Sequence, residues 1–383
     1  MSCSYLNDVV IVGVAESDLG KVPHMSPVDL MAQASMRALS EAGLQKEDVD
    51  GLFTSSAYYY MPTLTLAEYM GIIPKYMGSS STGGSSFLNH VSHAAMALAN
   101  GLCEVALVAY GSTQRTDSGG LVSMSELSPF EAPFGHVYPV SSYALATQRH
   151  MHEFGTTREQ LSEVAVSARK WAAMNEKAMN RGPLTFEEVS NSDLISSPLR
   201  KLDCCLVTDG GAALVLTTRE RAEKLKTKPV YIWGHGESTD HRNIVAMPDL
   251  TTTAAVHSGR SAYEMAGVEP KDIDVLELYD AFTINVLLFL EDLGFCRKGE
   301  GGRFVEGGTI APGGKLPVNT NGGGLSYCHP GMYGLFLLVE AVRQLRGECG
   351  QRQTANPRLV LAHGNGGVLS SQVSMILSNE KRS

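Results

Sequence analysis

Short apolar runs and longer amphipathic stretches alternate along this chain. The apolar runs are rich in β-branched residues, and they predict buried strands over 8–14, 49–54, 105–110 and 210–217. The amphipathic stretches predict helices over 28–41, 87–99, 143–154 and 158–175. Ser26 and Pro27 are residue types that favour a helix start, and Gly43 ends the first predicted helix. Strands that alternate with helices indicate an α/β fold.

The second half of the chain repeats the pattern of the first. Residues 42–52 (AGLQKEDVDGL) resemble 266–276 (AGVEPKDIDVL), and 106–111 (ALVAYG) resemble 359–364 (LVLAHG), in the same order. The repeat predicts two similar α/β units packed on each other, over 1–220 and 221–383, with the boundary near 217–228. Residues from about 113 to 203 fall outside the repeat and predict an insertion or cap laid over the core.

The stretch 319–334 (NTNGGGLSYCHPGMYG) carries the most distinctive residues. Its three consecutive glycines permit close backbone approaches, and the apolar run that follows, 335–339, predicts a buried helix. A histidine at such a junction, here His329, can donate a hydrogen bond to an anionic oxygen or move a proton. The alternative is a structural His-Pro turn. In the repeat, 79–84 takes the corresponding place, so helix N-termini of both units are expected to face one pocket that favours anionic ligands.

Composition narrows the class of protein. With 383 residues, 43% of them hydrophobic and 19% charged, the chain is expected to be a compact, enzyme-like protein. A net charge of −9 argues against nucleic-acid binding, and no apolar stretch is long enough to span a membrane. The N-terminus lacks the basic region of a signal peptide, and seven unevenly spaced cysteines suit a reducing cytoplasm. No set of residues has metal-ligand spacing.

Three stretches together resemble the thiolase superfamily, in particular the sterol-carrier-protein type of thiolase. They are 147–175, 197–216 and the NTNGGG…HPG run, and the resemblance covers nearly the whole chain. It implies a thiolase-like duplicated five-layer α/β/α/β/α fold, an obligate homodimer, and a coenzyme A thioester as substrate with no permanently bound cofactor. It also implies a separately encoded OB-fold/zinc-ribbon accessory protein.

The catalytic positions depart from the family pattern. The nucleophilic cysteine of the family falls on Ser80, and a tyrosine and an alanine replace the oxyanion-hole and acid/base residues in the tetrad 279–282 (YDAF). The acid/base cysteine of the last motif falls on Ala362, or on His363 if the register slips by one residue. Cys328 is a poor substitute, because neighbouring side chains diverge. The resemblance implies catalytic His329, Tyr279 and Ser80, and oxyanion-hole or substrate-binding Gly364, Asn365, Asp280, Asn285 and Gly83.

Three functions stay open at this point. The first is a retro-aldol lyase on acyl-CoA, which needs stabilisation of a thioester enolate but no acyl-enzyme. The second is an acyltransferase that uses Ser80, which needs a base nearby; His90 and His93 follow ten and thirteen residues later and are expected to be packing or surface residues. The third is a non-catalytic acyl-CoA-binding subunit of a complex.

Overall fold

The computed structural model describes residue 6, residues 8–117 and residues 128–382. The first unit contains β1 (Val9–Glu16), α1 (Pro27–Ala42), β2 (Gly51–Thr54), α2 (Pro62–Met70), β3 (Tyr76–Gly78), α3 (Ser86–Ala99), β4 (Val105–Ser112) and β7 (Gly210–Thr218). The start of α1 is confirmed, because the Ser26 side chain accepts from the Asp29 N–H and the Asp29 carboxylate accepts from the Ser26 N–H. Its end is confirmed as well, since Gly43 takes the left-handed conformation with φ 72°.

The second unit repeats this order. It contains β8 (Val230–Thr239), α8 (Ala255–Ala266), β9 (Val275–Leu278), α9 (Thr283–Asp292), α10 (Gly301–Val305), α11 (Gly334–Arg346), β10 (Leu359–Gly366) and β11 (Ser371–Ser378). A short helix, α7 (Arg219–Ala222), lies in the connection between β7 and β8. The unit boundaries, 1–220 and 221–383, stay predictions.

The strands form one mixed nine-stranded sheet in the order β3-β2-β4-β7-β1-β8-β11-β10-β9. β2 runs parallel to β3 and β4, and β9 runs parallel to β10, as helix crossovers require. The two halves join where β1 pairs with β8 through Val10–Tyr231 and Ile11–Val230. The α/β fold is therefore confirmed, with the addition that a short ladder links the two half-sheets.

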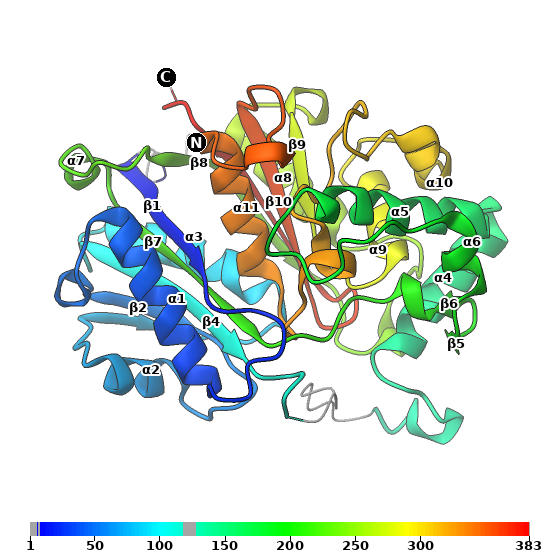
Figure 1. Cartoon of the computed structure of the whole chain (residues 1–383), viewed down its shortest axis with the longest axis horizontal. Helices are drawn as coiled ribbons and strands as arrows, with labels where there is room; N and C mark the ends of the chain where they lie inside the picture. The colour runs from blue at the N-terminus through cyan, green and yellow to red at the C-terminus, as the bar shows by residue number, and fades with distance from the viewer. Residues whose placement is uncertain (1–5, 7, 118–127, 383) are drawn as a thin grey trace.

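Helices cover both faces of each half-sheet (Figure 1). α3 and α11 lie between the halves: α3 packs on β4 and β7 and also reaches β11, while α11 packs on β10 and also reaches β7. α1 and α8 cover the outer faces, each through a glycine. A Cβ on Gly13 would lie 2.2 Å from Ala38 O, and one on Gly234 would lie 2.2 Å from Ala262 O. The duplication thus extends to the contact that seats each outer helix.

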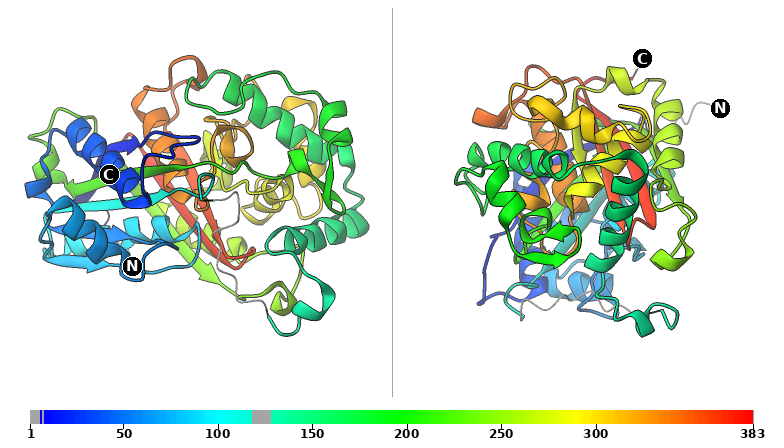
Figure 2. Two further views of the ribbon diagram at one scale, coloured as in Figure 1. Left: turned by 60° about the horizontal axis from the view of Figure 1, so that its bottom comes forward. Right: turned by 90° about the vertical axis from the view of Figure 1, so that its right-hand side faces the viewer.

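The inserted segment carries α4 (Val140–Phe154), α5 (Arg158–Ala173), α6 (Phe186–Asn191), β5 (Leu194–Ser196) and β6 (Leu199–Arg200). It follows β4 in the chain, but it packs beside α9 and α10 of the second unit (Figures 1 and 2). Trp171 Nε1 donates to Ile310 O at 2.9 Å, and His150 Nε2 lies 3.0 Å from Glu291 Oε1. In the part of the chain that the structure describes, no helix combines the length and apolar character needed to cross a membrane.

Candidate active site

Tyr279 follows directly after β9 and is almost completely buried. Its N–H donates to His363 O at 3.0 Å, which continues the pairing of β9 with β10. Its hydroxyl oxygen accepts from the Tyr333 N–H at 3.2 Å and lies 3.4 Å from Gly331 O. A Cβ on Gly84 would lie only 2.1 Å from Tyr279 Cε2. Gly84 therefore allows the chain just before α3 to lie against the tyrosine ring.

His329 lies beside Tyr279. Its N–H donates to Thr208 Oγ1 at 3.1 Å, which fixes the backbone before α11. The imidazole meets the Tyr279 ring edge-on with centroids 5.6 Å apart, and it stacks on the Tyr333 ring at 5.8 Å. Nε2 is buried and has no hydrogen-bond partner among the described residues. Burial lowers the pKa of His329 to about 4, so the ring is neutral at pH 7. The free nitrogen is placed to meet a ligand atom, because an unpaired buried polar atom costs free energy.

Asp280 supports the glycine loop before His329. Its carboxylate accepts from the Gly324 N–H at 2.6 Å and from the Leu325 N–H at 3.4 Å. A Cβ on Gly323 would lie 2.0 Å from Asp280 Oδ2, so this close approach requires glycine. Burial raises the pKa of Asp280 to about 7, although the backbone N–H groups oppose the rise. The residue predicted to bind substrate thus has its carboxylate occupied by the loop, and its contribution to the site is to position that loop.

Tyr333 belongs to the site, although sequence reasoning did not select it. Its hydroxyl donates to Asn321 Oδ1 at 3.0 Å, and the same oxygen accepts from the Gly323 N–H at 2.8 Å. Asn321 O accepts from Asn175 Nδ2 at 2.9 Å, which ties the end of the inserted segment's second helix to this loop. The rings of Tyr279, His329 and Tyr333 therefore form one rigid aromatic group.

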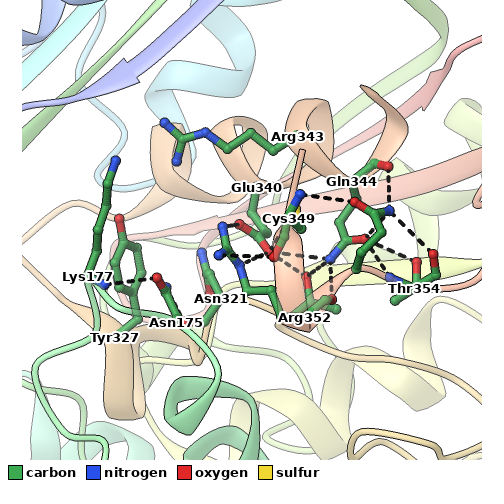
Figure 3. A network of polar contacts seen from close by, with 12 residues as sticks. Asn175, Lys177, Asn321, Tyr327, Glu340, Arg343, Gln344, Cys349, Arg352 and Thr354 are labelled. Carbon is green, nitrogen blue, oxygen red and sulfur yellow. Dashed lines mark hydrogen bonds and ion pairs between the residues drawn. The ribbon is translucent and has the colours of Figure 1, made fainter. Parts of the chain in front are cut away.

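A polar network joins α11 to the segment that follows it, and Figure 3 shows its members Glu340, Gln344 and Arg352. Glu340 on α11 accepts from Arg352 Nε at 2.8 Å and from Arg352 Nη2 at 3.0 Å. Its Oε1 also lies 2.8 Å from Thr320 Oγ1, which is equally close to Glu277 Oε1. Burial and the nearby Glu340 charge raise the pKa of Glu277 well above its ordinary value. The raised pKa favours the protonated form of Glu277, which reduces the repulsion between the two carboxyl groups around one hydroxyl.

The residue next to His329 faces a different environment. Cys328 is fully buried, and burial together with the Glu16 carboxylate raises the pKa of its thiol well above the ordinary value. Glu16 itself binds Arg343 Nη2 at 2.6 Å and Lys177 Nζ at 2.9 Å. Burial opposes ionisation of Glu16, but these two cations bring its pKa below the ordinary value. A thiol in these surroundings is not a nucleophile, in agreement with the sequence argument.

His90 is a buried packing residue, as expected, but it lies beside Ser80, which its separation in the sequence did not suggest. Its Nε2 accepts from the Ser80 N–H at 3.2 Å and lies 3.1 Å from Ser80 Oγ. The loop before α3 folds back over the helix, so ten residues of separation do not keep the side chains apart. The ring is fully buried between Phe53 and Phe87, and burial lowers the pKa of His90 to about 4. Ser80 thus has a neutral histidine beside it.

The glycine loop of residues 79–84 meets the C-terminal glycine loop at Gly367. Gly83 has φ 82°, and a Cβ there would lie 2.6 Å from Gly367 N. Gly364 lies on the face of β10 that packs against α3, whereas its neighbours in the strand, among them His363, point to the opposite face. His363 Nε2 lies 2.9 Å from Gln372 Oε1, and its ring packs on Phe289 at 4.5 Å. His363 is thus a core residue, so the shifted register gives no acid/base group.

An apolar cavity of about 620 Å³ lies between α4 and the segment after β8. Its apolar lining includes Phe130, Phe134, Leu145, Val245, Met247 and Leu250. None of the predicted site residues lines it. The cavity borders the inserted segment. Tyr143 on α4 of this segment stacks on Phe282 of the tetrad, with ring centroids 4.3 Å apart.

Comparisons with known proteins agree with this geometry. Residues 236–379 match the family model "Thiolase C-terminal domain-like". An acetyl-CoA acetyltransferase of Methanothermobacter thermautotrophicus is 33% identical over 376 residues, covering 94% of this chain and 97% of that protein. The 17-hydroxy-3-oxo-4-pregnene-20-carboxyl-CoA lyase of Mycobacterium tuberculosis is 38% identical over 365 residues, covering 88% and 91%. The chain belongs to the thiolase superfamily.

Within the superfamily, the chain falls in the branch of sterol-carrier-protein-type thiolases and steroid side-chain aldolases. The solved structure called "Ltp2-ChsH2(DUF35) aldolase" superimposes with a TM-score of 0.89 at 35% identity, covering 97% of this chain and 98% of that one. The thiolase-like fold is thus confirmed, and the protein is an enzyme of this family. Its relatives are named as lyases or aldolases and as acetyltransferases.

Sequence reasoning found part of this thiolase-superfamily site. It selected Tyr279 and His329, which the structure brings into contact. It missed Gly84 and Tyr333. Both lie inside segments already singled out for their glycines, so their small or aromatic character was the only signal. It also missed His90, whose contact depends on the fold of a loop.

Proposed function

We propose that this enzyme acts on acyl-CoA thioesters and cleaves the carbon–carbon bond next to the thioester by a retro-aldol reaction, without an acyl-enzyme. The observation that carries the proposal is the buried, unpaired Nε2 of neutral His329, whose ring meets the Tyr279 ring edge-on. Burial raises the pKa of Tyr279 well above its ordinary value, so the phenol keeps its proton and serves as a donor. Two neutral donors side by side suit an oxygen on which negative charge develops.

The step balances without a covalent intermediate. The β-hydroxyl gives its proton to a water molecule, the bond between the α- and β-carbons breaks, and its electron pair moves into the thioester enolate. His329 and Tyr279 would donate hydrogen bonds to the enolate oxygen, and the α-carbon then takes one proton back from water. The products are a ketone or aldehyde and a shorter acyl-CoA. The relative named as a CoA lyase and the solved aldolase support this reaction class.

An acyltransferase is the second candidate, and one observation favours it. Ser80 stands where the family has its nucleophilic cysteine, and His90 Nε2 lies 3.1 Å from its hydroxyl. A relative named as an acetyl-CoA acetyltransferase points the same way. However, the Nε2 lone pair also accepts from the Ser80 N–H, and the lowered pKa of His90 makes it a weak base. The non-catalytic alternative is set aside, because the chain is an enzyme of this family.

Mass spectrometry separates the two candidates. The protein is incubated with β-hydroxyacyl-CoAs, and both the small molecules and the intact protein are weighed. Cleavage predicts a ketone or aldehyde with a shorter acyl-CoA and no protein adduct. Ser80→Ala should keep activity within about tenfold, or 1.4 kcal/mol of barrier, as should Ser81→Ala beside it. His329→Ala should lose about 10²–10³ in turnover. An acyl adduct on Ser80, with a far larger loss in Ser80→Ala alone, would establish the acyltransferase.

We also propose that the protein is a homodimer with an accessory subunit. Large apolar side chains are exposed around α2 and the edge strand β3, among them Tyr60, Met61, Leu64, Tyr69, Ile73 and Met77. An exposed edge strand beside such a patch favours pairing with a second copy.

The accessory subunit is expected to bind a second exposed apolar group, which consists of Phe130, Phe134, Leu194, Ile195 and Val245. The name of the solved aldolase includes a DUF35 component. Light scattering alone and with such a partner would test both assemblies.

A further inference from the structure

Asn285 is a buried polar residue without a structural explanation. It lies in the first turn of α9, six residues after Tyr279, and its side chain is fully buried. Neither Oδ1 nor Nδ2 has a hydrogen-bond partner within the described part of the chain. Such an amide destabilises the folded state, and a leucine of similar size would not. An amide kept at this cost, next to the tetrad, is expected to meet a ligand.

A chain of hydrogen bonds ends beside this amide. Gln372 Nε2 donates to Asn365 Oδ1 at 2.9 Å, and Asn365 Nδ2 donates to the Tyr143 oxygen at 2.8 Å. Gln372 Oε1 can only accept, so His363 Nε2 carries a proton and His363 Nδ1 accepts from Ser374 Oγ. Every donor in the chain therefore points toward Tyr143. Hydrogen bonds aligned in this way polarise one another and strengthen the last donor.

The hydroxyl proton of Tyr143 is left almost free. It donates a long hydrogen bond to Gly367 O at 3.5 Å, at the limit of such a bond. Asn285 lies beside this tyrosine, because its N–H donates to Phe282 O at 3.0 Å and the Phe282 ring stacks on the Tyr143 ring. Burial raises the pKa of Tyr143, while the Asn365 amide, the Leu369 N–H and the Asn285 amide oppose the rise. The phenol therefore remains protonated and can donate. Together, the Tyr143 hydroxyl and the Asn285 amide offer donors and one acceptor to a single small polar group.

A circuit of contacts connects these groups to the Tyr279 site. The Tyr143 ring stacks on Phe282, three residues after Tyr279, and its hydroxyl approaches Gly367. Gly367 abuts Gly83, and the next residue, Gly84, abuts the Tyr279 ring. Packing contacts therefore join Tyr143 to the segments that carry Tyr279.

We propose that Asn285 and Tyr143 form a polar subsite that binds the oxygen atom on the β-carbon of the acyl group. This inference rests on the proposed action on acyl-CoA, because it takes the thioester oxygen to lie at His329 and Tyr279. Asn285 Oδ1 accepts a hydrogen bond from the β-hydroxyl, and Tyr143 donates to its oxygen. When that oxygen becomes a carbonyl, Asn285 Nδ2 and Tyr143 both donate to it. Both residues stay neutral, so they orient the oxygen rather than take its proton.

Binding measurements with matched ligand pairs test the subsite. One pair is 3-hydroxybutyryl-CoA and butyryl-CoA; the other is 17-hydroxy-3-oxo-4-pregnene-20-carboxyl-CoA and its 17-deoxy analogue. By calorimetry, the wild type should bind the oxygenated member of at least one pair about 10–100-fold more tightly. Asn285→Leu should reduce this preference to within about threefold and leave the affinity for the deoxy ligand unchanged. Tyr143→Phe should reduce the preference in the same direction.

Thermal unfolding excludes a merely structural role. Asn285→Leu removes an unpaired amide, so its melting temperature should equal or exceed that of the wild type. The control Asn89→Leu removes a buried amide whose Oδ1 is also unpaired among the described residues but whose Nδ2 donates to Glu237 at 2.6 Å. Because this variant breaks that hydrogen bond, it should melt lower and keep the ligand preference. A wild type without preference, or Asn285→Leu with the wild-type preference, would overturn the subsite. A lower melting temperature with unchanged preference would show that Asn285 holds only a structural water.

The same experiments separate this inference from the proposed reaction. If the wild type cleaves no β-hydroxyacyl-CoA, yet prefers the oxygenated ligand through Asn285, the lyase proposal fails and the subsite stands. If the wild type cleaves its substrate, but Asn285→Leu keeps both the preference and the rate, the lyase proposal stands and the subsite fails.

Discussion

Replacing Tyr279 with phenylalanine removes one oxygen atom from the centre of the site. The phenylalanine ring keeps the contacts with Gly84 and His329, so the packing around the ring is preserved. The Tyr333 N–H loses the acceptor that it meets at 3.2 Å. A buried donor left unpaired costs about 1–3 kcal/mol, and Tyr279→Phe should lower the free energy of unfolding by that amount.

The effect on catalysis should be larger than the effect on stability. The hydroxyl lies 3.4 Å from its nearest acceptor, Gly331 O, so its proton is available to a ligand. If it donates to a thioester enolate, its removal costs one oxyanion donor, which is worth about 10²–10³ in turnover or roughly 2.7–4 kcal/mol. Ground-state binding depends less on this bond, because charge on the oxygen develops only in the transition state. The dissociation constant for acyl-CoA should therefore change only a few-fold.

Three measurements test this reasoning: single-turnover rates, calorimetric dissociation constants and urea unfolding. Tyr263→Phe is the matched control, since its hydroxyl donates to a backbone carbonyl, Leu293 O, at 3.0 Å on the outer helix α8. The control should lose stability and keep its turnover. A Tyr279→Phe enzyme that cleaves its substrate at the wild-type rate would reduce Tyr279 to a wall residue, and the lyase proposal would lose its main support.

Three further predictions follow from the surroundings of the site. Because burial raises the folded-state pKa of Asp280 to about 7, the wild type should lose stability as pH rises from about 4 to 7; urea titrations should show Asp280→Asn without this loss. In Gly84→Ala the new Cβ would lie only 2.1 Å from the Tyr279 ring, so the ring must move and turnover should be abolished. Gly182→Ala, with open space around the new Cβ, should keep the wild-type turnover in the same assay. Glu16→Gln strands the buried charge of Arg343 and should cost about 3–5 kcal/mol of unfolding free energy, measured by urea unfolding.

Much of the fold could be predicted from local patterns. The capping residues predict the helix of residues 27–42, and runs of β-branched residues predict the buried strands. The junction between the half-sheets could not be predicted from the sequence, because two residue pairs between distant segments leave no periodic signal. The placement of the inserted helices beside α9 and α10 was hidden for the same reason, since His150 and Glu291 are far apart in the sequence.

Some site residues could likewise be predicted from the sequence and others could not. Tyr279 and His329 lie in motifs, so the resemblance identified them. Tyr143 lies outside the motifs on a predicted amphipathic helix, where one aromatic residue looks like any other. Its role emerges only from the chain of donors that β10 and β11 direct toward it. Asn285 was named by resemblance, but its unpaired state is visible only once its neighbours are placed.

Burial sets the direction of the chemistry that this site can perform. It keeps Tyr279 protonated and His329 neutral, and it weakens His90 as a base by lowering the pKa from 6.5 to about 4. At about 1.4 kcal/mol for each pH unit, that change weakens His90 by roughly 3 kcal/mol in taking a proton from Ser80. Fixed neutral donors, by contrast, act best where water is excluded, because a low dielectric strengthens each hydrogen bond to a developing anion. The same burial that weakens an acyl-serine mechanism therefore favours one in which charge appears on the ligand's own oxygen.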